Sequence, residues 1–157
     1  MTSKSIAKSW FVAVAFAVAP LAAVAQAGAF ADVRVVTVNA GYDDAKDRLS
    51  TAIEGKGLKI DRVARISEML DRTGADLGAK RKVYERAEIF EFCSAKLSRD
   101  MMEADPRNVV LCPYGIAVYA IAGEAGKSYF AYRIPPQRTG TAPVASLLAD
   151  IVKEAAE

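Results

Sequence analysis

Residues 109–134 read VVLCPYGIAVYAIAGEAGKSYFAYRI and hold two strands joined by a short turn. The first part, Val109 to Ala122, is almost continuously apolar, which is typical of a strand covered on both faces, in the centre of a sheet or at a subunit interface. Pro113-Tyr114-Gly115 must interrupt this run with a bulge or a turn. Gly123 to Gly126 is a hairpin turn, and the aromatic segment Ser128 to Ile134 is the second strand.

The chain on either side of this hairpin alternates between strand and helix patterns. Alternating or β-branched residues predict three earlier strands, at Val33–Val38, Leu58–Val63 and Val83–Cys93. Apolar residues at helical spacing, with capping residues before them, predict helices that begin near Asp43, at Ser67, at Ser94 and at Pro143. The first three of these helices end at Gly57, Gly74 and Asp105-Pro106.

The predicted order is therefore β-α-β-α-β-α-β-β-α. Mixed order with hairpin-joined late strands argues for the α+β class, with a single mixed or antiparallel sheet and helices packed mainly on one face. Residues 33–157 are expected to form one domain with one core, since about 130 residues suit a single domain.

The N-terminus has the pattern of a cleavable secretory signal peptide. Lys4 and Lys8 give a positive start, residues 10–19 are apolar, and Ala25-Gln26-Ala27 offers the small residues that a signal peptidase accepts. Cleavage is expected after Ala27, with Ala31 as the alternative. The mature domain is then expected in the periplasm or secreted, with no stable membrane anchor.

The composition excludes several classes of function. Lys4 and Lys8 leave with the signal peptide, so the remaining 19 Lys and Arg residues balance 19 Asp and Glu residues, and nothing favours nucleic acid as a partner. The chain has no His. This excludes Ser-His-Asp and Cys-His catalysis, as well as His-ligated zinc, non-haem iron, blue copper and haem. We expect no cofactor, and an enzyme is the less favoured reading.

Three segments carry a resemblance to a known family: Gly55-Lys56-Gly57-Leu58-Lys59-Ile60, Ile89-Phe90-Glu91-Phe92-Cys93-Ser94 and Leu111-Cys112-Pro113-Tyr114-Gly115-Ile116-Ala117-Val118-Tyr119. Together they resemble the DUF302 family, small bacterial α+β domains of unassigned function, over about Val36 to Pro135. The resemblance implies a compact fold able to form a homodimer through its sheet. It supplies no catalytic residues.

Cys93 and Cys112 are the first candidate site residues. An exported protein meets an oxidising compartment, so a disulfide between them is one interpretation and two buried thiols are another. A third is a redox pair, because Cys93 lies near a helix N-terminus, where the pKa of a thiol falls. A weaker hypothesis adds Met101 and Met102 to make a Cu(I) site, since thiolate and thioether ligands select Cu(I).

The late strands carry a further candidate, an aromatic binding face made by Tyr114, Tyr119, Tyr129 and Tyr132, for which core packing is the alternative. Glu91 lies between two Phe residues, so an inward orientation would require a partner such as Arg86, Arg99 or Arg133. The preferred function is an exported, non-enzymatic binding or accessory domain, whose partner is an unknown small ligand or a periplasmic protein. The alternatives are a periplasmic thiol redox protein that uses Cys93 and Cys112, and a Cu(I)-binding protein.

Overall fold

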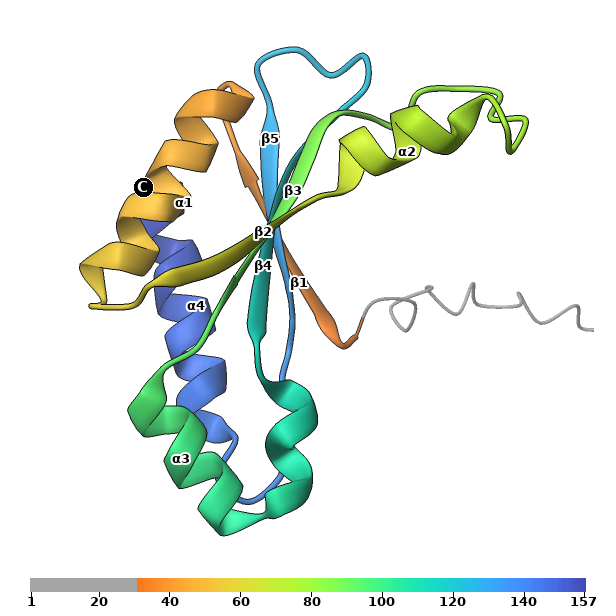
Figure 1. The fold of residues 1–157 in the computed structure, drawn as a ribbon. Helices are drawn as coiled ribbons and strands as arrows, with labels where there is room; N and C mark the ends of the chain where they lie inside the picture. The colour runs from red at the N-terminus through yellow and green to blue at the C-terminus, as the bar shows by residue number, and fades with distance from the viewer. Residues whose placement is uncertain (1–30) are drawn as a thin grey trace, which may run out of the picture.

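The computed structural model describes residues 31–157 (Figure 1). Its elements follow the predicted order, with one short 3-10 helix added before the fourth strand. The predicted signal peptide, residues 1–27, lies outside the described residues. Within residues 31–157, no helix combines the length and apolar character needed to cross a membrane.

The five strands form one sheet in which each neighbouring pair is antiparallel. The strands are β1 (Val33–Val38), β2 (Ile60–Arg65), β3 (Tyr84–Phe92), β4 (Tyr114–Ile121) and β5 (Ser128–Arg133). Their order across the sheet is β1-β5-β4-β3-β2. The α+β class with a single sheet is therefore confirmed, and the apolar run supplies its central strand, β4.

Helices α1 (Tyr42–Gly55) and α4 (Ala142–Ala156) pack against each other on one face of the sheet (Figure 1). Helix α3 (Ala95–Ala104) lies beyond the end of the sheet and contacts α4. The core between sheet and helices is made of fully buried side chains, among them Leu49, Ile53, Phe92, Ile116, Val118, Phe130, Val144 and Ile151. Each such side chain contributes about 1.5–3 kcal/mol by leaving water, so this layer is the main source of stability.

The start of the apolar run differs from its prediction as a strand. Residues Pro106–Leu111 form a 3-10 helix, and β4 begins only at Tyr114. Local signals explain the difference, because Pro106 occupies the first turn and the carboxylate of Asp105 accepts a hydrogen bond from the backbone N–H of Arg107 at 2.9 Å. Capping therefore outweighs the apolar strand pattern at this point.

Helix α2 (Ile66–Gly74) follows β2 without a loop, so Ser67 lies in its first turn rather than at the predicted cap. The Ser67 hydroxyl accepts a hydrogen bond from the backbone N–H of Ala87 at 3.0 Å. Since β2 has ended at that point, this N–H of β3 has no partner from β2 and takes the hydroxyl instead. Ser94 does cap α3, as predicted.

Candidate functional site

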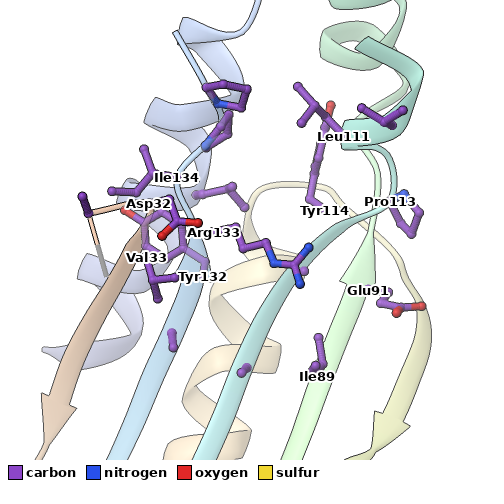
Figure 2. Close-up of a pocket in the computed structure, with 18 of the residues that line it drawn as sticks. Asp32, Val33, Ile89, Glu91, Leu111, Pro113, Tyr114, Tyr132, Arg133 and Ile134 are labelled. Carbon is purple, nitrogen blue, oxygen red and sulfur yellow. The ribbon is translucent and has the colours of Figure 1, made fainter. Parts of the chain in front are cut away.

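The candidate site is a cavity at one end of the sheet, where β4 and β5 diverge (Figure 2). Their pairing reaches from Tyr119–Tyr129 to Ile116–Tyr132 and goes no further. Beyond it, Pro135 and Pro136 have no backbone N–H and cannot extend the ladder. The N–H of Ile134 instead donates to the carbonyl of Asp32, at 2.7 Å. The chain after β5 therefore stays with β1 and leaves a gap beside β4.

The cavity has a volume of about 990 Å³ and a mainly apolar lining. Its apolar walls come from the 3-10 helix, the start of β4, the segment after β5 and one residue of α4: Val110, Leu111, Pro113, Tyr114, Ile134, Pro135, Pro136 and Leu148. Ile89, Ala117 and Ala131 extend the lining onto the face of the sheet that α1 and α4 leave uncovered. We call this side of the sheet the open face. A space of this volume fits a small molecule.

Three charged side chains line the cavity: Asp32, Glu91 and Arg133. Glu91 does not point into the core. It lies on the open face, where its carboxylate is 3.8 Å from the guanidinium of Arg62. This partner is not among the three arginines considered from the sequence, because the pairing of β2 with β3, which places Arg62 opposite Glu91, is a long-range contact.

Arg133 is exposed and extends from β5 toward β4 (Figure 2). Arg133 follows the last residue pair of β4 and β5, Ile116–Tyr132, and Gly115 precedes that pair on β4, so both line the gap where the strands diverge. Gly115 pairs on its other side with Glu91. Within residues 31–157, no carboxylate forms an ion pair with Arg133. The cavity therefore has one guanidinium whose donors are open to a ligand.

Gly115 forms part of the cavity floor in the central strand. Its φ is not among the positive values found at five other glycines, so its backbone conformation does not require glycine. A Cβ at this position would lie 3.3 Å from Cγ2 of Ile89. A glycine inside a strand often marks a place where a ligand or another backbone approaches closely. The missing side chain here leaves room above β4.

The four tyrosines predicted as an aromatic face are divided between the two sides of the sheet. Tyr119 and Tyr129 stack on the open face, with ring centroids 5.1 Å apart, and Tyr84 adds an edge-on contact to Tyr119 at 5.6 Å. Tyr114 and Tyr132 are buried on the helix side and reach the cavity from there. The reason is the alternation of side chains along a strand, since the two tyrosines are five positions apart in β4 and three positions apart in β5.

Tyr114 has the hydrogen-bond partner that a buried phenol needs. Its hydroxyl lies 2.8 Å from the hydroxyl of Ser98 on α3. Burial raises the pKa of Tyr114, and the bond to Ser98 opposes this only in part. Tyr114 is therefore a neutral phenol at physiological pH, one that fixes the cavity wall and does not bring charge into it.

Cys93 and Cys112 lie at disulfide distance, with Cα atoms 6.5 Å apart and a sequence separation of 19 positions. They connect the end of β3 to the segment that enters β4, next to the cavity residue Pro113. Both are half-buried, and the Sγ of Cys112 is 3.8 Å from the Ser98 hydroxyl. The cysteine pair is therefore placed to hold the cavity wall around Pro113 in position.

The two methionines of the Cu(I) hypothesis lie on α3. Met101 is fully buried in the core, and Met102 is partly buried against it. Among residues 31–157, no group of three Cys, Asp or Glu side chains is placed to hold a metal ion. The position of Met101 is that of a packing residue.

The sequence reasoning missed Gly115 as a site residue and named Arg133 only as a partner for Glu91. A usable signal existed for Gly115, because a glycine inside an apolar central strand has no packing role of its own. For Arg133 the signal was weaker. Its position at the end of an aromatic strand, shortly before two prolines, indicates where the hydrogen bonds of β5 end. It does not indicate which residues of the neighbouring strand lie near it.

The model of the family named "Domain of unknown function DUF302" matches residues 34–157. No curated protein matches the chain. Among solved structures, the crystal structure of an uncharacterised conserved protein, DUF302, from Bacillus stearothermophilus is similar, with 19% sequence identity and a TM-score of 0.58. The similarity covers 80% of this chain and 94% of that chain, and at this identity it supports the fold alone. Because the family model spans most of its length, the chain belongs to the DUF302 family.

Proposed function

We propose that this protein is an exported, non-enzymatic binding domain whose small-molecule ligand occupies the cavity at the end of the sheet. The observation that carries the proposal is the cavity itself, about 990 Å³ with mainly apolar walls and a few charged groups. This combination is typical of small-molecule sites. The signal-peptide pattern of residues 1–27 supports a working place in the periplasm or outside the cell.

The cavity can be tested with a neutral apolar dye, N-phenyl-1-naphthylamine, whose fluorescence rises when it leaves water. Gly115→Val places a side chain on the cavity floor, next to Ile89. Gly41→Val is the matched control, because a Cβ at Gly41 meets no atom within 4 Å. We expect wild type and Gly41→Val to bind the dye equally, and Gly115→Val to bind it several-fold more weakly. Equal binding by all three would refute the cavity as the binding site.

We also infer that the partner on the open face is a second copy of the chain. Four residues that pair in sequence across neighbouring strands form a row on the open face, and all of them are uncharged: Val35, Ala131, Ala117 and Ile89. Val35 is 47% exposed. An uncharged row of this kind lets two copies approach without leaving a charge unpaired between them, which would be costly. The charged residues Glu91 and Arg133 lie in the next row, at the cavity end.

A thiol redox protein is the second candidate function. The observation in its favour is that Cys93 and Cys112 are at disulfide distance while remaining half-buried rather than enclosed. A redox titration of the purified protein separates a cycling pair from a structural one. A potential in the range of periplasmic thiol partners supports cycling, and a potential below about −300 mV identifies a structural disulfide.

A further inference from the structure

We propose that the cavity binds a small amphiphile whose anionic head group pairs with Arg133 and whose apolar body lies between the diverging ends of β4 and β5. This inference rests on the proposed binding function, because it names the ligand class of the same cavity. It follows from three features of the site: an unpaired guanidinium, an open space above Gly115 and apolar walls beyond them.

The first feature is the charge arrangement among the lining residues. Glu91 already faces Arg62, at 3.8 Å. Asp32 lies at the start of the edge strand β1, and β5 separates it from β4. Arg133, by contrast, extends from β5 toward the central strand and has no ion-pair partner among the described residues (Figure 2). A guanidinium offers parallel N–H donors that match a carboxylate and similar anions.

The second feature is the space into which Arg133 extends. Gly115 lies on β4 just beyond its last pair with β5, Ile116–Tyr132, and lines the same gap as Arg133 and Glu91 without a side chain to fill it. The nearest atom that a Cβ would meet is Cγ2 of Ile89, at 3.3 Å. A head group can therefore approach the guanidinium above β4, with apolar contact to Ile89 of the neighbouring strand β3.

The third feature is the depth of the apolar region next to the guanidinium. Leu111 and Pro113 form one wall, Ile134 and Pro135 form the opposite one, and Leu148 of α4 contributes from the core side. None of these side chains offers a hydrogen-bonding group, so they favour a hydrocarbon or aromatic body over a sugar or a nucleotide. An anion on a compact apolar body satisfies both parts of the cavity.

Isothermal titration calorimetry with three single-chain probes tests the head group. Decanoate, decanol and decyltrimethylammonium have straight alkyl chains of nearly equal length and carry negative, zero and positive charge. Each is titrated into wild type, Arg133→Gln and Arg48→Gln. Arg48 is an exposed cation on α1, outside the cavity lining, and its substitution removes the same charge elsewhere.

We expect wild type to bind decanoate about tenfold more tightly than decanol, the size of effect of one charge-assisted hydrogen-bonded pair. Arg133→Gln should lose about tenfold for decanoate and nothing for decanol, and Arg48→Gln should match wild type. Unchanged decanoate affinity in Arg133→Gln, or tightest binding of decyltrimethylammonium, overturns the anionic class but leaves the binding cavity in place. If none of the three probes binds, this inference is overturned, and the dye titration then decides separately whether the binding function also fails.

Discussion

Lys46 of α1 and Glu88 of β3 form an ion pair that joins the helix layer to the sheet, with Nζ 2.7 Å from Oε2. The side chain of Glu88 is only 7% exposed, whereas that of Lys46 is 30% exposed. A carboxylate buried to this degree depends on its cation, because it has lost most of its water. We therefore expect this ion pair to contribute to the stability of the folded protein.

Lys46→Met should lower the free energy of unfolding by about 3 kcal/mol, since it leaves a buried carboxylate without its cation. Urea denaturation at neutral pH measures the change. Lys59→Met is the control, because Lys59 is exposed and makes no ion pair within the described residues. The double variant Lys46→Met/Glu88→Leu should recover much of the loss. Equal stabilities of the Lys46 and Lys59 variants would contradict the role assigned to the pair.

Glu88 also predicts a pH dependence. Burial alone would raise the pKa of its carboxyl, but the adjacent ammonium of Lys46 and the charge of Arg86 outweigh burial and hold the pKa below its ordinary value. A carboxyl with a lowered pKa in the folded state stabilises the protein above its unfolded-state pKa, and this stability is lost as pH falls through the folded-state pKa.

The stability advantage of wild type over Glu88→Gln should accordingly be full at neutral pH. It should shrink as pH falls from about 5 toward 3, because the carboxylate then becomes protonated and loses its ionic partner. Thermal unfolding of both proteins across this range is the measurement. If the stability difference between wild type and Glu88→Gln stays constant from pH 7 to pH 3, protonation of Glu88 is not coupled to unfolding in this range.

Gly140 occupies a position that no other residue fits, in the loop before α4. Its φ is +84°, and a Cβ would lie 2.9 Å from Cβ of Ala104 and 3.1 Å from Cα of Met101. Gly140→Ala should therefore cost about 2 kcal/mol, from both backbone strain and a clash with α3. Gly126→Ala separates the two causes, because Gly126 has φ +71° but a Cβ there meets nothing within 4 Å.

The Gly126 variant should lose only about 1 kcal/mol, the backbone contribution alone. Chemical denaturation of both variants gives the comparison. Equal losses at the two positions would mean that the loop before α4 moves away from α3 without cost, and the close approach would then not be a constraint on the fold.

Much of the fold was predictable because its signals are local. Alternation and helical spacing gave the order of elements, Ser94 marked the start of α3 as its cap, and Pro143 marked the first turn of α4. The apolar run also identified the central strand. The prediction of a strand at Val109 to Leu111 was wrong, because a capping signal of only a few residues starts a 3-10 helix that takes in the first part of the apolar run.

The candidate site was less predictable because its residues come from separate parts of the chain. Gly115 and Glu91 become neighbours only through the register of β3 and β4, and Arg133 joins them only because β5 lies next to β4 in the sheet. The gap itself opens where the β4–β5 pairing ends at Ile116–Tyr132 while β5 stays paired with β1 as far as Val33–Arg133. The division of the tyrosines was within reach of the sequence, because Tyr114 and Tyr119 are an odd number of residues apart in one strand and must face opposite sides.

The cysteine pair gives a stability prediction for its structural role, in which the disulfide is a permanent bridge. A disulfide between Cys93 and Cys112 restricts the unfolded chain, and for a loop of this length the expected contribution is about 3 kcal/mol. The variant with both cysteines replaced by Ser should lose that amount in urea denaturation. Dithiothreitol should destabilise wild type to a similar extent and leave the variant unchanged. A wild type that is insensitive to the reductant would contradict the bridge.

The pairing of two copies through the open face can be tested by placing a charge in its uncharged row. Ala117 is at the centre of that row, in the central strand, so Ala117→Arg sets two guanidinium groups into a symmetric interface, where like charges repel. Thr51→Arg adds the same charge on the exposed side of α1. Sedimentation equilibrium should show dimers for wild type and Thr51→Arg, and a dissociation constant raised at least about tenfold for Ala117→Arg. A monomeric wild type would refute pairing with a second copy. A dimer that Ala117→Arg leaves intact would place the pairing surface elsewhere. Ala117 also lines the cavity, so the dye titration of Ala117→Arg gives a separate measurement. If this variant loses dye binding but still forms dimers, Ala117 contacts the ligand and does not take part in pairing.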